Sequence, residues 1–241
     1  VRPYAHYIEW LEHFDVTEAR EFWRRHLHGV EQITSIPILP GYEHEQGYAM
    51  GESTFRLTDE ASTNLLEVAH RAKVTLSTLL QAAWAVVLCR YHDTHDIVFG
   101  AIVSGRPAEV DRVEQIVGLF INAIPVRIQI DEAQTFVDLL GNVQGLALEA
   151  EPFHHCPLPE ILTLTPLRQG LFDHLFILEN YPTDHATGMG DDDGDLVIED
   201  PGAHDETHYP FNLVVVPGEL VEFRLSYNVH AYPEEQIEQV R

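Results

Sequence analysis

The apolar run from Asp96 to Val103 constrains the fold more than any other segment of the chain. It reads Asp-Ile-Val-Phe-Gly-Ala-Ile-Val and is rich in β-branched residues, which is typical of a short strand covered on both faces. The segment before it, from Thr75 to Val87, places leucine, alanine and valine at helical spacing. The two segments together predict an apolar helix packed on a sheet.

The remaining periodicity predicts further helices and strands around this centre. Helical spacing recurs in residues 4–11, 15–27, 59–73 and 136–151, and a last helix is expected after Pro233. Strands are expected at residues 54–57, 124–130, 174–179, 212–216 and 221–229. Pro217-Gly218-Glu219 predicts a hairpin turn between the last two strands, and the stretch 29–47 predicts a loop because it is rich in Pro and Gly. This order predicts a mixed α/β fold.

The charge balance excludes two classes of partner. The 241 residues include 14 Lys and Arg against 39 Asp and Glu, which gives a formal net charge of −25. Such a surface repels nucleic-acid phosphates and anionic lipids, so neither nucleic acid nor a membrane is an expected partner. No apolar run approaches the roughly 20 residues that a membrane span needs, and no secretory signal is visible. The cytoplasm is the expected location.

Two clusters of possible metal ligands occur in the sequence, and neither completes a known metal site. His92 and His95 could offer two metal ligands, but no third ligand completes a known spacing. The acidic run Asp191 to Asp195 resembles the start of a calcium loop, yet position six is Leu196 where an EF-hand needs Gly. Neither metal site is therefore expected.

The two cysteines are expected to be buried or inert thiols. A lone pair of distant cysteines, Cys89 and Cys156, is a poor disulfide framework in a chain of this length. Cys156 follows His154 and His155 directly, but adjacent residues in a Pro-bounded segment rarely reach the geometry of a thiol–imidazole pair. No nucleophile is predicted from these patterns.

One long motif provides the strongest functional signal. Val103-Ser-Gly-Arg-Pro107 is followed, after a short acidic linker, by Ile116-Val-Gly-Leu-Phe-Ile-Asn-Ala-Ile-Pro-Val-Arg127. This stretch resembles the core motif Val-Gly-x-Phe-x-Asn-Thr of the condensation domains of nonribosomal peptide synthetases, with its preceding Ser-Gly-Arg element. The departure is Ala123, where Thr is common in the family.

Three further regions resemble the same family and occur in the family's order. Tyr4-Ala-His-Tyr-Ile-Glu-Trp10 is similar to its Tyr-x-Asp-Tyr-x-x-Trp helix, with His6 in place of Asp. The strand region 170–182 is similar to the one after its Asn-Pro-Leu-Phe element, although Gln169-Gly170 stands in place of Asn-Pro. Residues 207–218 and 225–228 resemble the segments that close the sheet. The resemblance thus extends over nearly the whole chain.

The resemblance implies a fold and an incomplete enzyme. Residues 1–241 would form the C-terminal lobe of a condensation domain, a chloramphenicol acetyltransferase-like α/β sandwich with a mixed sheet flanked by helices. The catalytic signature His-His-x-x-x-Asp-Gly belongs to the N-terminal lobe and is expected before the Tyr4 helix, and the final helix is expected to be truncated at Arg241. The only His pair, His154-His155, continues Cys-Pro-Leu-Pro-Glu and is not that signature. No catalytic residue is therefore expected in this chain, and the isolated lobe is expected to be inactive.

The resemblance also implies which residues lie at the reaction tunnel, which runs between the two lobes. Six residues are expected at the tunnel or at the lobe interface: Ser104, Gly105, Arg106, Gly118, Phe120 and Asn122. Ser104 and Gly105 would face the tunnel, and Arg106 would pair with the signature aspartate across the interface. Gly118 would let the backbone approach a thioester arm, or would serve packing alone. Asn122 would orient a carbonyl group or pin a neighbouring loop.

The implied reaction needs partners and no resident cofactor. Two phosphopantetheine arms belonging to carrier proteins bring a donor thioester and an acceptor amine together, and neither an organic cofactor nor a metal is required. The expected partners are the N-terminal lobe, the donor and acceptor carrier proteins and an adjacent adenylation domain. Two alternatives stay open: a non-catalytic docking platform for carrier or adenylation domains, and an epimerisation-type relative. The second is disfavoured because Leu119 and Ile121-Asn122 stand where that subtype carries Trp and Thr.

Overall fold

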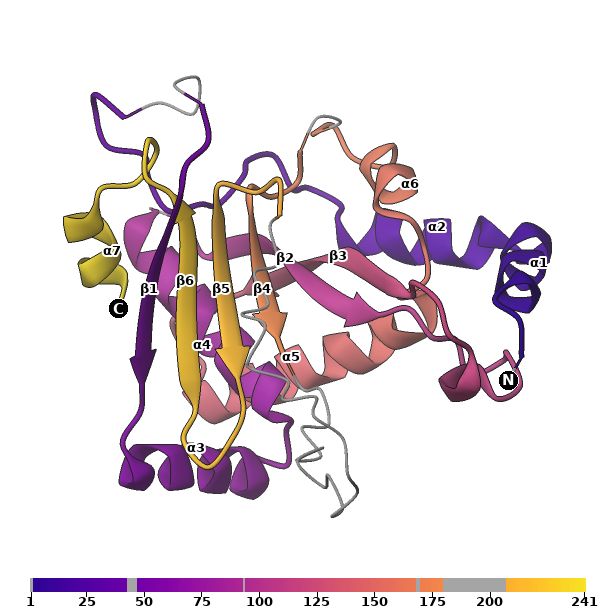
Figure 1. The fold of residues 1–241 in the computed structure, drawn as a ribbon, viewed down its shortest axis with the longest axis horizontal. Helices are drawn as coiled ribbons and strands as arrows, with labels where there is room; N and C mark the ends of the chain where they lie inside the picture. The colour runs from indigo at the N-terminus through magenta and orange to yellow at the C-terminus, as the bar shows by residue number, and fades with distance from the viewer. Residues whose placement is uncertain (1, 43–46, 93, 168–169, 180–206) are drawn as a thin grey trace, which may run out of the picture.

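The computed structural model describes residues 2–42, 47–92, 94–167, 170–179 and 207–241, and its centre is a mixed sheet (Figure 1). Within these residues the sheet has six strands in the order β1-β6-β5-β4-β2-β3. The two middle pairs, β5–β4 and β4–β2, are parallel, and the outer pairs are antiparallel. The strands are β1 (Met50–Arg56), β2 (Asp96–Ser104), β3 (Ile121–Gln129), β4 (His174–Leu178), β5 (Phe211–Val216) and β6 (Glu222–Asn228).

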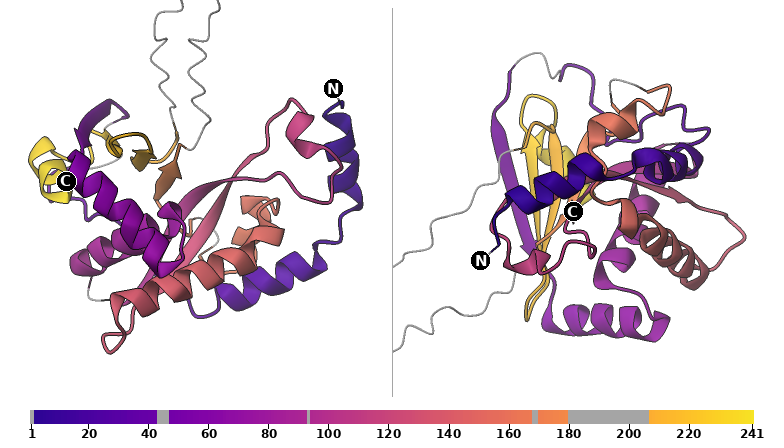
Figure 2. Two further views of the ribbon diagram at one scale, coloured as in Figure 1. Left: turned by 90° about the horizontal axis from the view of Figure 1, so that it is seen from below. Right: turned by 90° about the vertical axis from the view of Figure 1, so that its right-hand side faces the viewer.

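Helices cover both faces of the sheet (Figure 2). The α-helices are α1 (Ala5–His13), α2 (Val16–His26), α3 (Asp59–Ala72), α4 (Leu76–Tyr91), α5 (Phe136–Ala150), α6 (Leu158–Leu162) and α7 (Glu234–Val240), and the 3-10 turns are η2 (Val113–Gln115) and η3 (Glu151–Phe153). The core under α4 and α5 includes side chains from β2 to β6, and a second core lies between α2, α6 and the opposite face of β2, β3 and β4. Helix α7 lies beside β1, and the two termini are at opposite ends of the molecule.

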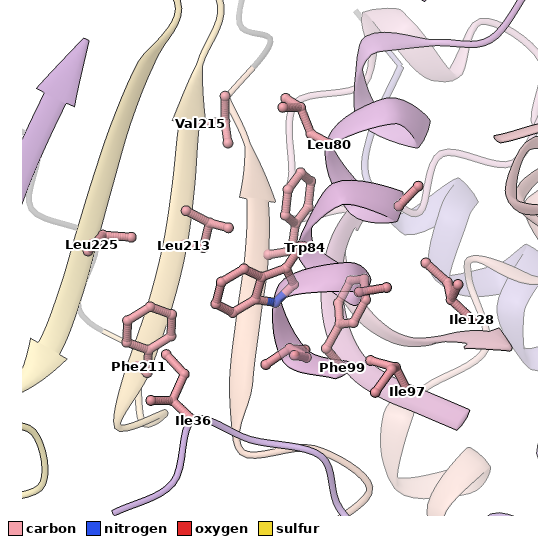
Figure 3. Close-up of a cluster of buried hydrophobic side chains, with 14 of the residues drawn as sticks. Ile36, Leu80, Trp84, Ile97, Phe99, Ile128, Phe211, Leu213, Val215 and Leu225 are labelled. Atoms are coloured by element: carbon pink, nitrogen blue, oxygen red, sulfur yellow. The ribbon is translucent and has the colours of Figure 1, made fainter. Parts of the chain in front are cut away.

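The helix–strand pair predicted from the apolar runs forms the main core (Figure 3). Thr75 caps α4 by accepting a hydrogen bond from the backbone N–H of Thr78. Trp84 points from α4 toward the sheet, and its indole Nε1 donates to Nε2 of the buried His174 over 3.1 Å. The strand β2 is buried on both faces as expected, with Phe99 on the α4 side and Val98 on the α2 side.

Most of the predicted elements are confirmed, with differences at the ends. The strand expected from Ile124 begins at Ile121, and the strand expected from Thr54 begins at Met50. The short helix α6 was not predicted from the sequence. No single helix among the described residues is long and apolar enough to cross a membrane, and α3 and α4 reach such a length only together, across a bend of 103°. The acidic run Asp191 to Asp195 lies outside the described residues.

Candidate functional site

The loop between β2 and β3 is fastened from the inside by Arg106. Nη1 of its guanidinium group donates to the carbonyl oxygens of Val113, at 2.5 Å, and Ile116, at 3.1 Å. The Cζ atom of the same group lies 4.0 Å from the centre of the Phe120 ring, within the range of a cation–π contact. Arg106 therefore holds the loop in one shape from within the chain, and its expected pairing with an aspartate of another lobe stays a prediction.

Helix α1 packs on the inner side of this loop. A Cβ atom added to Gly118 would lie 2.0 Å from Cδ2 of Tyr4, so only glycine lets the tyrosine ring sit against the backbone there. The Tyr4 hydroxyl donates to the carbonyl oxygen of Leu119 over 2.5 Å. The buried Phe120 ring lies 5.3 Å from the Tyr4 ring and 4.5 Å from the Tyr7 ring, measured between ring centres. Gly118 thus contacts Tyr4, the residue before α1, and Phe120 contacts both Tyr4 and Tyr7 of α1, so the packing role left open for Gly118 is observed.

An exposed apolar ridge, made of Val117, Leu119 and Ile121, runs along the outer side of this loop and ends at the first residue of β3. These side chains are 81%, 72% and 53% exposed. An extended backbone sends alternate side chains to opposite sides, so the contacts of Gly118 and Phe120 with α1 turn these three residues outward. Three neighbouring apolar side chains, two on the loop and one at the first residue of β3, therefore lie exposed to solvent.

Asn122 connects the start of β3 to the segment between η3 and α6. Its Nδ2 donates to the carbonyl oxygens of His154, at 2.8 Å, and Cys156, at 2.7 Å. Of the two roles expected for Asn122, pinning a neighbouring loop is therefore observed. Gly105 lies close by, where its backbone N–H donates to the Phe120 carbonyl oxygen over 2.8 Å, and an added Cβ atom would meet that oxygen at 2.7 Å.

A cavity of about 580 Å³ lies between the strands β2 and β3 and helix α5. Ser104, Gly105 and Arg106 line it, whereas Gly118, Phe120 and Asn122 are not part of its lining. The six predicted residues therefore divide into three that face the cavity and three that hold its surroundings in place. Several polar side chains of the lining were not predicted from the sequence, namely His26, Gln81, Glu109, Arg127, Gln144 and His154.

The imidazoles that line the cavity are neutral at pH 7. Burial lowers the pKa of His26 to about 4, helped by the nearby positive charge of Arg127. Burial also lowers the pKa of His154 to about 4, with a smaller effect of His155. A base with so low a pKa takes up a proton weakly at pH 7, so neither ring is matched to deprotonating an amine there.

Arg127 ties the cavity wall to helix α2. Its Nε and Nη2 donate to the two carboxylate oxygens of Asp96 over 2.8 and 2.6 Å. Its Nη1 donates to the carbonyl oxygens of His26 and His28, both over 2.8 Å. The side chain of Arg127 is mostly buried, and this bidentate ion pair with two additional carbonyl bonds fixes the end of α2 beside the cavity.

The side chains of His155 and Cys156 are buried, so the segment 154–156 contributes to packing. The His155 ring is buried between the rings of Trp10 and Phe14, with ring centres 4.9 and 4.2 Å away, and burial lowers its pKa. Burial raises the pKa of the Cys156 thiol to about 11. The segment therefore holds no activated nucleophile. Among the described residues, no group of three His, Cys, Asp or Glu side chains is arranged to hold a metal ion.

Comparisons with known proteins agree on one family. The family whose sequence profile matches is the condensation domain, over residues 1–241. Bacitracin synthase 3 of Bacillus licheniformis is 38% identical over 96% of this chain and 4% of its own length. Tyrocidine synthase 2 of Brevibacillus parabrevis is 34% identical over 100% of this chain and 7% of its own length. The chain thus spans less than a tenth of either relative.

Solved structures share the fold. A four-domain nonribosomal peptide synthetase bound to AMP and glycine superposes with a TM-score of 0.76 at 19% identity, over 95% of this chain and 18% of that one. The X-domain from teicoplanin biosynthesis superposes with a TM-score of 0.74 at 21% identity, over 98% of this chain and 55% of that one. The sheet and its flanking helices are therefore the architecture that the sequence motifs implied, and this chain matches about half of that X-domain.

Proposed function

The chain belongs to the condensation-domain family of nonribosomal peptide synthetases, and from that premise we propose that it is the C-terminal lobe of an amide-forming domain. In the complete domain, the amine of an aminoacyl thioester on one carrier protein attacks the acyl or peptidyl thioester on another. The new C–N bond forms as the donor thiol leaves. We propose that this lobe supplies one wall of the reaction site, and that the general base belongs to the other lobe.

The observation that carries this proposal is the apolar ridge of Val117, Leu119 and Ile121. A ridge held in place by Tyr4 and Arg106 does not collapse onto the rest of the chain, so its apolar area stays in water until a partner covers it. The ridge leads directly into β3, one of the strands that line the cavity. A partner seated on it would therefore lie beside the cavity, where the N-terminal lobe is needed.

The side chains that line the cavity support the proposal that the general base belongs to the other lobe. Neither His26 nor His154 is basic enough to serve as the base at pH 7, which agrees with a catalytic histidine brought by the other lobe. Arg106 uses only Nη1 for the loop carbonyls. Among the described residues, its Nε and Nη2 have no hydrogen-bonded partner, so they are available for the proposed ion pair with the signature aspartate.

The proposed partners follow from the proposed reaction. Holding two thioester arms in one site converts a reaction between two molecules into one within a complex, which provides much of the rate. The arms are phosphopantetheine groups of a donor and an acceptor carrier protein, and the lobe itself needs no cofactor. An adjacent adenylation domain would load a carrier, and the proposed place of action is the cytoplasm.

Binding of an N-terminal lobe tests the proposal. The N-terminal half of the condensation domain of bacitracin synthase 3 is titrated with this chain in a calorimeter. Saturable binding is expected, and Leu119→Asp is expected to weaken it about tenfold or more, because burying a leucine contributes roughly 1.5–3 kcal/mol. Val68→Asp, which changes an exposed apolar residue of α3, is the matched control and should leave the affinity unchanged.

The same titration with a phosphopantetheinylated carrier protein distinguishes the docking-platform alternative from the proposed catalytic lobe. A platform would bind the carrier protein tightly without any N-terminal lobe, and its affinity would not respond to Leu119→Asp. Absence of lobe binding together with tight carrier binding would replace the proposed catalytic role with the platform role.

A further inference from the structure

The thiol of Cys89 lies beside an imidazole ring at the far end of helix α4. Cys89 is on the last turn of the helix, and His95 follows in the turn that leads into β2. The Sγ atom of Cys89 is 3.5 Å from Nδ1 of His95, which is within hydrogen-bond range for sulfur. The thiol proton therefore has an acceptor within reach.

A carboxylate lies at the opposite nitrogen of the same ring. Nε2 of His95 is 3.3 Å from Oε1 of Glu132, which belongs to the turn after β3. Two hydrogen bonds order the chain around this contact: the Ile130 N–H donates to the His95 carbonyl oxygen over 2.8 Å, and the Ala133 N–H donates to a side-chain oxygen of Asp131 over 2.9 Å. The carboxylate favours a proton on Nε2, which leaves the lone pair of Nδ1 facing the thiol.

The side chains of Cys89, His95 and Glu132 are arranged in a row and do not surround a common point. The thiol and the carboxylate approach opposite nitrogens of one ring, so they do not converge on a common point. Among the residues that the structure describes, no three His, Cys, Asp or Glu side chains are placed to share a metal ion. A thiol, an imidazole that accepts its proton and a carboxylate that orients the imidazole are the parts of an activated cysteine nucleophile.

We propose that Cys89 is a reactive cysteine, activated by His95 and oriented through Glu132, and that it forms mixed disulfides with small disulfide molecules. The S–H bond breaks as the proton moves to Nδ1 of His95. The thiolate sulfur attacks one sulfur of the disulfide, a new S–S bond forms, and the other sulfur leaves as a thiolate that takes up a proton. The small disulfide is the oxidant, and Cys89 is oxidised while one half of the disulfide is reduced.

The surroundings of Cys89 allow this reaction. Cys89 packs against the main core and is partly exposed, and the side chains of His95 and Glu132 beside it are 50% and 82% exposed, so the cluster as a whole borders solvent. The second cysteine provides an internal comparison. Cys156 is 1% exposed, and burial raises the pKa of its thiol. The same molecule therefore carries one accessible, assisted thiol and one buried thiol.

Reaction with 2,2′-dithiodipyridine tests the proposal, because each mixed disulfide releases one absorbing thiopyridone. At pH 7 a fast phase is expected that peptide mass spectrometry assigns to Cys89, and Cys89→Ser should remove it. His95→Gln should slow this phase about tenfold, because the variant has no imidazole within reach of the thiol to accept its proton. Glu132→Gln should give a smaller decrease. Circular dichroism checks that each variant is folded.

A second pH value separates proton transfer from simple shielding. At pH 9.5, above the pKa of about 8.5 of an ordinary thiol, the protein and its His95→Gln variant should react at equal rates. A rate ratio that persists at both pH values would mean that the ring acts by steric effects, and would overturn the proposal. Equal rates at pH 7, or labelling of Cys89 as slow as that of Cys156, would overturn it as well. If His95→Gln does not fold, an unchanged pH 7 rate in Glu132→Gln contradicts the proposed relay.

Discussion

Replacing Asn122 should remove the two hydrogen bonds that join the start of β3 to the segment between η3 and α6. Its Nδ2 donates to two carbonyl oxygens, those of His154 and Cys156, and the side chain is partly buried. Removing a hydrogen-bond donor leaves each carbonyl oxygen without that partner, at about 1–1.5 kcal/mol each. Asn122→Ala should therefore lower the free energy of unfolding by about 2–3 kcal/mol.

Asn122→Asp keeps the shape of the side chain and reverses its chemistry. At pH 7 a carboxylate would face two carbonyl oxygens without a donor, so a larger loss of about 4 kcal/mol is expected. A protonated aspartic acid can donate one hydrogen bond, so the difference between Asn122→Asp and Asn122→Ala should shrink at pH 5. This decrease of the difference with pH distinguishes the loss of a hydrogen-bond donor from the loss of side-chain volume.

The assays are urea unfolding and thermal unfolding, both followed by circular dichroism, with each variant compared with the unchanged chain at the same pH. For a chain of this size, 1 kcal/mol corresponds to about 2–4 °C in the melting temperature, so Asn122→Ala should melt about 4–12 °C lower. Asn142→Asp is the matched control, because Asn142 donates to the side chain of Gln134 at an exposed site and should change stability by under about 0.5 kcal/mol. The reasoning is refuted if Asn122→Asp is as stable as Asn122→Ala at pH 7, or if both match the control.

Three other changes test neighbouring parts of the site. Gly118→Ala should destabilise the chain by about 1–3 kcal/mol in urea unfolding, because the facing tyrosine ring must move, whereas Gly141→Ala in α5 should be neutral or stabilising because its added Cβ atom meets nothing within 4 Å. Arg127→Lys should lower the melting temperature by several degrees, because lysine cannot make the bidentate ion pair and both carbonyl bonds at once; an unchanged melting temperature would refute the role given to Arg127. The free energy of unfolding should fall as the pH drops from about 6.5 to about 4, because the histidines of the unfolded chain bind protons in this range, whereas folded His26 and His154, with pKa values of about 4, do not. The loss is at most about 3 kcal/mol per histidine. His26→Gln and His154→Gln should each make the free energy of unfolding depend less on pH.

The sequence predicted the elements better than it predicted their ends. The buried strand β2 and helix α4 were predicted because a fully apolar run and a regular helical period are each compatible with few structures. The sequence predicts a strand only from Ile124, three residues after the observed start of β3, because the exposed Ile121 breaks the alternation of apolar and polar residues. Helix α6 was not predicted, because it is only five residues long and Pro157 and Pro159 at its start are typical of a loop.

The roles of individual residues depended on distant partners that the sequence does not reveal. The packing role of Gly118 is decided by Tyr4, and the bonds of Asn122 by a segment some thirty residues further on. His26 joins the cavity only because Arg127 binds the carbonyl oxygen of His26 at the end of α2. The contact between Cys89 and His95 depends in the same way on the placement of His95 beside the last turn of α4.

Amide formation on carrier proteins, measured with and without an N-terminal lobe, tests most directly whether this chain is half of a catalyst. Two loaded carrier proteins are mixed with the chain, with the lobe, or with both joined in one polypeptide, and the carrier-bound dipeptide is measured by mass spectrometry. Product above the carriers-only background is expected from the joined lobes alone. It should be lost when the second histidine of the His-His-x-x-x-Asp-Gly signature is replaced. Amide formation by this chain alone, or a folded joined protein that forms no amide, would contradict the claim.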